Sequence, residues 1–178
     1  NKIFLWHTWF SDVFNRDDRE GFDIVIGNPP YIGEKGHKEI FQPVKSDIHL
    51  GQYYLGKMDY FYFFFHLAFN MLSPHGVATF ITTNYYPTAL GARRLRADIK
   101  DRMSIKTLFN LGELRLFENA PGQHNMISSF SKGKDGCKCQ VIDVHKKGAL
   151  NPIMFTSIIN HIDEDTTYAD VAQEDLYD

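Results

Sequence analysis

The sequence has few of the features by which many protein classes are recognised. Its 178 residues include two cysteines, Cys137 and Cys139, whose CxC spacing fits neither a disulfide framework nor a zinc site. The longest apolar run, 60–72, is interrupted by His66 and Asn70 and is too short to cross a bilayer. A net charge of −3 excludes a chain that binds nucleic acid through overall basicity. These absences favour a globular domain, and its length is sufficient for a sizeable core.

The usual short catalytic motifs are also missing. The sequence has no Walker loop, HExxH or GxSxG, and no glycine-rich turn that links a strand to a helix. It does have an apolar segment, 22–27, that is typical of a buried parallel strand. Asn28-Pro29-Pro30-Tyr31 follows directly, and the prolines end the strand because neither can donate to a β-ladder. Since ligands of open α/β sheets bind beyond the carboxyl ends of strands, this tetrapeptide lies where such folds do chemistry.

The residue types of the tetrapeptide suit a substrate with an amino group on a planar ring. Asn28 offers a side-chain carbonyl and Pro29 a backbone carbonyl, so two acceptors can converge on one –NH2 group. Tyr31 offers a flat face for the ring. The alternative is that the two prolines only end the strand and that Tyr31 fills a crevice, because Asn and Pro are ordinary loop residues.

The strand, the tetrapeptide and the segments that follow resemble a known family. NPPY after such a strand is similar to the catalytic motif of amino-group methyltransferases that use S-adenosylmethionine. The later segments resemble, within that group, the adenine-specific DNA methyltransferases of type II restriction–modification systems. They are Lys57-Met58-Asp59-Tyr60 opening an aromatic helix, the strand 76–84, and Leu116-Phe117-Glu118-Asn119-Ala120 before a second strand, 125–130.

This resemblance implies roles for the tetrapeptide. Asn28 and the Pro29 carbonyl would accept hydrogen bonds from the exocyclic amine of a flipped adenine, with Pro30 in the same catalytic motif. Tyr31 would stack on the base and Phe117 would pack against it, although Phe117 can also be explained as a core aromatic. S-adenosylmethionine would supply the methyl group, and Asn28 and Pro29 would border it.

The resemblance extends from residue 4 to about residue 145 and implies a partial Rossmann-like α/β fold. The family holds its cofactor with a glycine-rich turn and an acidic residue, and neither is found here. Only 27 residues precede Asn28, too few for three strands and their crossover helices. We therefore expect residues 1–150 to form the C-terminal half of a catalytic domain, inactive alone. Residues 151–178 are expected to be a linker or the start of a target-recognition region.

The implied partners are double-stranded DNA, the missing upstream half of the catalytic domain and a downstream target-recognition domain. The resemblance implies a cytoplasmic prokaryotic protein without a membrane partner. The strand 22–27 would expose an unpaired edge and cause self-association. Two alternatives stay open at this point: a methyltransferase that acts on RNA or on a protein glutamine, and a degenerate interaction module without catalysis.

The pattern of apolar residues predicts alternating elements. The connection 32–57 carries Lys35, Lys38, Lys45 and Lys57, and we interpret it either as a segment that follows a phosphate backbone or as a solvated loop. Asp59 is expected to cap the helix after it. The predicted elements are helices 6–14, 59–72, 90–103 and 152–162, strands 22–27, 77–83, 105–111 and 125–131, a hairpin of 126–130 with 139–144, and a linker from residue 163.

Overall fold

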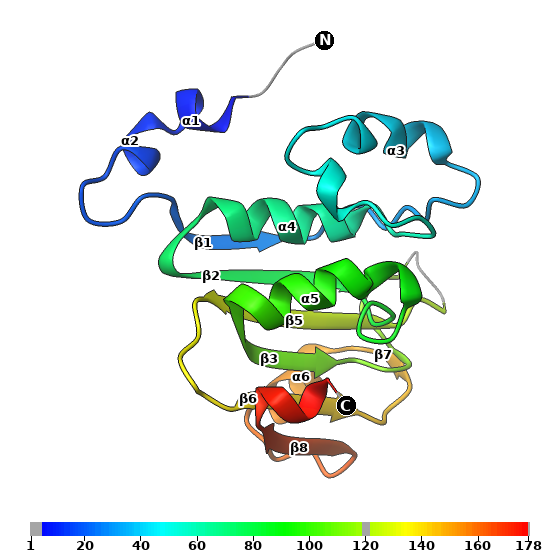
Figure 1. Cartoon of the computed structure of the whole chain (residues 1–178). Helices are drawn as coiled ribbons and strands as arrows, with labels where there is room; N and C mark the ends of the chain where they lie inside the picture. The colour runs from blue at the N-terminus through cyan, green and yellow to red at the C-terminus, as the bar shows by residue number, and fades with distance from the viewer. Residues whose placement is uncertain (1–4, 119–121, 178) are drawn as a thin grey trace.

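The computed structural model describes residues 5–118 and 122–177 and centres on one six-stranded sheet (Figure 1). Its strand order is β1-β2-β5-β3-β6-β8. The β1–β2 and β3–β6 pairs are parallel, whereas β5 is antiparallel to both neighbours and β8 is antiparallel to β6. The predicted α/β class is therefore confirmed. The strands are β1 Phe22–Gly27, β2 Leu72–Thr83, β3 Met103–Asn110, β5 Asn125–Lys132, β6 Cys139–Val144 and β8 Thr166–Val171.

Helices cover both faces of this sheet, but unequally. α4 (Phe61–Met71), α5 (Arg93–Arg102) and the short η3 (Gln173–Leu176) lie on the front face, and α6 (Pro152–Ile159) lies behind β3 and β6 (Figure 1). α4 is apolar almost all round, so it is buried between its neighbours. Among the described residues, no helix combines the length and apolarity needed to cross a bilayer.

Aromatic rings dominate the core beneath α4. Phe65 stacks on Phe80 of β2 with ring centroids 4.7 Å apart, and it meets Phe130 of β5 edge-on. Phe69 also contacts Phe130 edge-on, at 5.4 Å. Edge and offset ring contacts add to the stabilisation from buried area, so this cluster fixes α4 against the centre of the sheet. A second, smaller core lies on the opposite face, where Ile158 of α6 is buried.

The helical predictions hold in type but not in detail. Residues 6–14 form two short helices, α1 (Trp6–Trp9) and α2 (Ser11–Phe14), instead of one. The predicted helix 90–103 divides into η2 (Leu90–Ala92) and α5. Asp59 does not cap α4, because the N-cap position is Tyr60 and no side chain there accepts a capping hydrogen bond.

The connection after the tetrapeptide is more ordered than predicted. It contains α3 (Lys38–Lys45) and the single turn η1 (Gly51–Tyr53). Phe41 and Val44 of α3 are buried, three residues apart on one helical face. So short a repeat, with Pro43 inside it, gives little helical signal in the sequence.

Two predictions about the C-terminal part are wrong. The segments 126–130 and 139–144 do not form a hairpin, because β3 lies between β5 and β6. Residues from 163 onward do not form a linker, since β8 pairs with β6 along its full length. The acidic composition is misleading here. Asp163 is 6% exposed, bonded to Lys146 and to the Thr166 hydroxyl, and shapes the turn into β8.

The predicted unpaired edge is present in the described residues. β1 ends the sheet and pairs only with β2. Ile24 and Ile26 of β1 are 67% and 78% exposed, while Val25 between them packs against the main core. Alternate residues of a strand face opposite sides, so the two isoleucines lie on a face of β1 that no described helix covers.

Candidate functional site

The Asn28–Tyr31 tetrapeptide lies directly beyond the carboxyl end of β1, as predicted. The last residue of β1, Gly27, is paired with Phe80, and a Cβ at Gly27 would lie 2.9 Å from the Phe80 ring. Asn28 and Pro30 are exposed and Pro29 is buried. The Asn28 carboxamide is therefore outside the dry core and open to a ligand.

Tyr31 is held between the tetrapeptide and β2. Its hydroxyl oxygen lies 2.6 Å from Asn28 Oδ1 and 2.8 Å from the Ile81 carbonyl oxygen. Its ring meets Phe61 of α4 edge-on, with centroids 6.0 Å apart. Burial raises the pKa of Tyr31 to about 12, so the phenol keeps its proton at neutral pH. These contacts fix both the ring and its hydroxyl.

A pocket of about 320 Å³ lies beside the tetrapeptide, along the outer edge of β1. Ligand pockets of this size and apolar lining accept flat organic groups. No carboxylate lines it among the described residues. The lining residues are Trp6, Phe22, Val25, Ile26, Gly27, Asn28, Pro29, Pro30, Phe64, Leu67, Ala68, Met71 and Phe80.

The described residues fit only one side of a site for S-adenosylmethionine. Asn28 and Pro29 border the pocket, and their contact with the cofactor stays a prediction. The cofactor also carries a charged amino-acid end and a ribose, whose hydroxyls favour acidic or backbone partners at a glycine-rich turn. Neither a carboxylate in the lining nor a glycine-rich strand–turn–helix occurs in the described part of the chain.

The start of α4 is brought alongside the tetrapeptide by backbone contacts. The Tyr60 N–H donates to the Ile32 carbonyl at 2.8 Å, and Gly33 and Asp59 form an isolated β-bridge. Burial raises the pKa of Asp59, whose carboxylate lies 3.3 Å from the Tyr62 hydroxyl. Asp59 was predicted only as a helix cap, yet its bridge to Gly33 places it beside the segment that follows the tetrapeptide.

A chain of polar side chains joins three strands at the same edge of the sheet. Asn84, after β2, donates to Asn110 Oδ1 at 3.0 Å, and Asn110 donates to Asp143 Oδ1 at 2.7 Å. Thr83 Oγ1 and Asn84 Oδ1 are buried without a hydrogen-bond partner among the described residues. The position of Thr83 and Asn84 at the carboxyl end of β2, which neighbours β1, was the sequence signal for this wider polar edge.

Phe117 lies in the connection between β3 and β5, at the edge of the sheet that carries the tetrapeptide. It is half-buried, and among the described residues no hydrogen bond or ring contact joins it to Asn28 or Tyr31. Two strands separate β1 from β3, a spacing of about 14 Å at about 4.8 Å per strand. Asn119 and Ala120 of the same motif lie outside the described residues. The predicted contact of Phe117 with a base stays a prediction.

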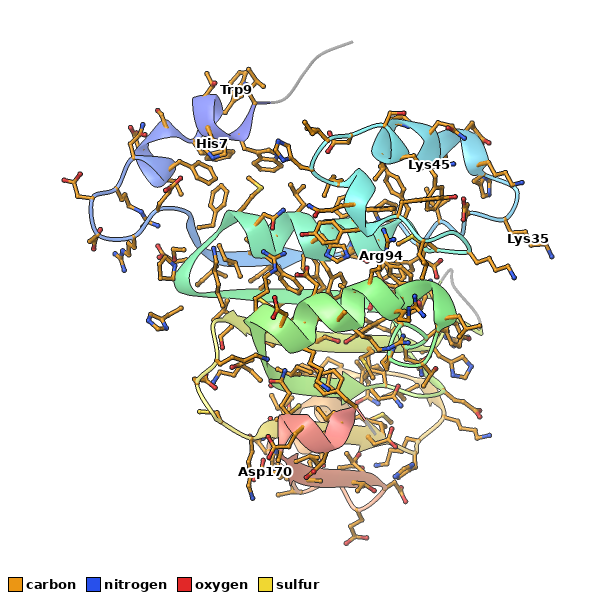
Figure 2. The ribbon with its side chains drawn as sticks, in the orientation of Figure 1. His7, Trp9, Lys35, Lys45, Arg94 and Asp170 are labelled. Atoms are coloured by element: carbon orange, nitrogen blue, oxygen red, sulfur yellow. The ribbon has the colours of Figure 1, made fainter. Side chains whose placement is uncertain are left out.

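Basic side chains lie on and beside the segment that carries α3. Lys35 and Lys45 lie on this segment, and Arg94 extends from α5 (Figure 2). Arg94 donates to the carbonyls of Gln52 and, at 2.9 Å, Tyr54. The Lys45 ammonium lies 4.7 Å from the centre of the Tyr54 ring. Part of the positive charge thus anchors the segment to the body of the protein instead of facing solvent.

We expect Gly91→Ala to displace the segment that supports the tetrapeptide. A Cβ at Gly91 would lie 2.1 Å from the Lys57 carbonyl oxygen and 3.2 Å from Met58 Cα. Both contacts are backbone atoms, which can move only if the chain shifts. Thermal unfolding should therefore show a decrease of about 2–3 kcal/mol in the free energy of unfolding. The control is Gly33→Ala, whose Cβ meets only Asp59 Oδ1, at 3.7 Å. Equal stability of the two variants would contradict this packing.

Comparison with known proteins adds relatives from restriction–modification systems. A type II methyltransferase from Haemophilus influenzae, M.HincII, is 25% identical over 141 residues, which cover 79% of this chain and 28% of the relative. The restriction enzyme and methyltransferase RM.Eco57I from Escherichia coli is 23% identical over 100 residues, 55% of this chain and 10% of the relative. The chain thus spans little more than a quarter of M.HincII and a tenth of RM.Eco57I.

Solved structures share the fold at low sequence identity. The type IIG restriction endonuclease BpuSI superposes with a TM-score of 0.59 and 16% identity, over 86% of this chain and 19% of that one. A type I restriction–modification methyltransferase subunit from Streptococcus thermophilus superposes with a TM-score of 0.60 and 16% identity, over 84% of this chain and 34% of that one. The family model of the Eco57I restriction-modification methylases matches residues 1–117, more than half of the chain. The chain belongs to the Eco57I restriction-modification methylase family.

Proposed function

We propose that this chain is the base-binding part of a DNA adenine methyltransferase of a type II restriction–modification system. The observation that carries the proposal is the exposed Asn28 carboxamide beside the Pro29 carbonyl, at the carboxyl end of β1 and next to an apolar pocket. Family membership supports methyl transfer, and S-adenosylmethionine supplies the methyl group in this proposal. The protein would act in the prokaryotic cytoplasm.

The Asn28 and Pro29 carbonyl oxygens would bind the amine by accepting hydrogen bonds from its two N–H groups. The lone pair of an aromatic amine is conjugated with the ring and is weakly nucleophilic. Two acceptors on one side favour a pyramidal nitrogen whose lone pair points away from the ring, and prearranged dipoles of this kind are a large catalytic term. No general base is needed, because the amine proton becomes acidic only after methylation and can leave to solvent. Tyr31 and Phe117 would hold the ring of the extruded base.

The proposal is tested by methyl transfer from labelled S-adenosylmethionine to DNA duplexes. We expect incorporation into adenine-containing duplexes and none when every adenine is already methylated on its amine. Because the chain alone lacks most of a cofactor site, the assay uses the full-length protein. Incorporation into RNA or protein instead of DNA would identify the alternative methyltransferase class. No incorporation into any acceptor, together with no cofactor binding, would favour a degenerate interaction module.

The proposed partners are duplex DNA, the upstream half of the catalytic domain and a downstream target-recognition domain. The upstream half would pair with the free edge of β1 and cover Ile24 and Ile26, whose exposure otherwise has no compensation. The basic residues near α3 would contribute to DNA contacts by donating hydrogen bonds to phosphate oxygens, and two of these residues, Lys35 and Lys38, are exposed.

We expect the 178-residue chain to self-associate through the β1 edge. An unpaired apolar strand pairs with other copies, so light scattering should show a mass that rises with concentration. Replacing both Ile24 and Ile26 by lysine should reduce this association. The control is Ile48→Lys, which removes an isoleucine that is 86% exposed but lies outside the sheet. A monomeric wild-type profile at high concentration would contradict the expectation.

A further inference from the structure

The hydroxyl group of Tyr31 supplies a hydrogen-bond donor where the β1–β2 ladder ends. The β1–β2 ladder ends at Gly27. Pro29 and Pro30 have no N–H, so they cannot supply donors to β2 beyond this point. The Ile81 carbonyl is the acceptor left there, and the Tyr31 hydroxyl lies 2.8 Å from it.

The direction of the Ile81 carbonyl follows from its neighbour. The Thr82 carbonyl accepts from the Asn125 side chain of β5, at 3.3 Å, so it points toward β5. Successive carbonyls of a strand point to opposite sides. The Ile81 carbonyl therefore points toward β1, where the described backbone supplies no donor. A half-buried carbonyl without a donor loses the free energy of a hydrogen bond, so it binds an available O–H group.

The Tyr31 phenol has one proton and two oxygen neighbours. The Ile81 carbonyl oxygen is 2.8 Å away and Asn28 Oδ1 is 2.6 Å away. Ile81 is fixed in the sheet, whereas the Asn28 side chain is exposed, so its carboxamide has room to turn. With the proton on the Ile81 side, a carboxamide oxygen would face the lone pairs of the phenol. A half-turn of the carboxamide exchanges its oxygen and its NH2, which are nearly identical in shape, and replaces this repulsion by a hydrogen bond.

We propose that the Tyr31 hydroxyl is a positioning group for Asn28. It donates to the Ile81 carbonyl and accepts from the Asn28 NH2, so Asn28 Oδ1 faces away from the phenol, toward the space beside the tetrapeptide. The free acceptor is then held ready for the substrate amine, with no rotation needed at the moment of reaction. The catalytic consequence rests on the proposed function, but the hydrogen-bond pattern does not.

This assignment separates the hydroxyl of Tyr31 from its ring. A phenylalanine at this position keeps the aromatic face for a base but removes the group that orients the amide. Asn28 would then populate both carboxamide orientations, and in one of them its NH2 would face the substrate amine. The result is a weakened transition state with ring contacts retained, which affects kcat more than KM.

The first test measures the Asn28 side-chain amide directly, by 1H–15N NMR of the 178-residue chain. We expect its two NH2 protons to be well separated in shift, because one is bonded to the phenol and the other faces solvent. In Tyr31→Phe the pair should move to the shifts of an exposed asparagine. The matched control is Tyr86→Phe, which removes a buried hydroxyl that is 2.7 Å from Ser128 Oγ and should leave the Asn28 pair unchanged.

The second test is the methyl-transfer assay of the full-length protein. Tyr31→Phe should lower kcat about tenfold, the value of one oriented hydrogen bond, with KM for DNA within about twofold. Solvent-like Asn28 signals in the wild type, or signals that Tyr31→Phe does not move, overturn the hydrogen-bond pattern. The expected signals with an unchanged kcat overturn the positioning role. The expected signals in a wild-type protein that transfers no methyl group refute the proposed function and leave the hydrogen-bond pattern standing.

Discussion

Asn28→Ala is expected to reduce methyl transfer to adenine by about 10²–10³-fold, the usual cost of losing a prearranged hydrogen-bonding group. The carboxamide provides one of the two acceptors for the substrate amine in the proposed function. Because Asn28 is exposed, its truncation should change the free energy of unfolding by no more than about 0.5 kcal/mol. Single-turnover rates on a saturating duplex measure the effect on chemistry apart from DNA binding.

The matched control is Asn160→Ala, an exposed asparagine at the end of α6 on the opposite face of the sheet. It should leave the transfer rate unchanged. Transfer by Asn28→Ala at the wild-type rate would contradict the role assigned to this side chain. A parallel loss of stability and activity in the same variant would indicate that Asn28 supports the fold instead.

Asp98→Ala is expected to destabilise the protein by about 3 kcal/mol, or about 6–12 °C in Tm for a domain of this size. Asp98 of α5 is bonded to Arg102 through both oxygens and to His66 Nδ1, at 2.6 Å. The His66 side chain is fully buried, and burial lowers its pKa, although Asp98 opposes that shift. Removing the carboxylate leaves a buried imidazole N–H and a partly buried guanidinium without their main partner.

The comparison variant is Asp101→Ala, which removes an exposed carboxylate from the same helix. It should shift the free energy of unfolding by less than about 0.5 kcal/mol. Chemical denaturation of both variants at neutral pH separates the two expectations. Comparable midpoints for Asp98→Ala and wild type would show that the His66–Asp98–Arg102 cluster does not stabilise the packing of α4 on α5.

Local signals in the sequence were sufficient for the centre of this fold. β1, α4 and the tetrapeptide were predictable because each has a strong periodic or steric signature: an apolar run, an aromatic helix and two prolines. The order β5-β3-β6 was not predictable, because a glycine turn between two strands suggests a hairpin. The position of β3 between them depends on packing across the whole sheet. The site residues follow the same division. Asn28 was visible as a motif, but the approach of Asp59 depends on a bridge to Gly33.

The two ends of the connection that carries α3 are held together by hydrogen bonds. Glu34 accepts from the Tyr54 hydroxyl and from the Lys57 N–H, so residues twenty or more positions apart meet at one carboxylate. The residues between them form a closed loop, so the length of this loop does not affect the position of the Asn28–Tyr31 tetrapeptide. The entropic cost of lengthening a closed loop grows only logarithmically, by about 0.6 kcal/mol per doubling. Evolution can therefore lengthen or shorten this loop while the tetrapeptide stays in place.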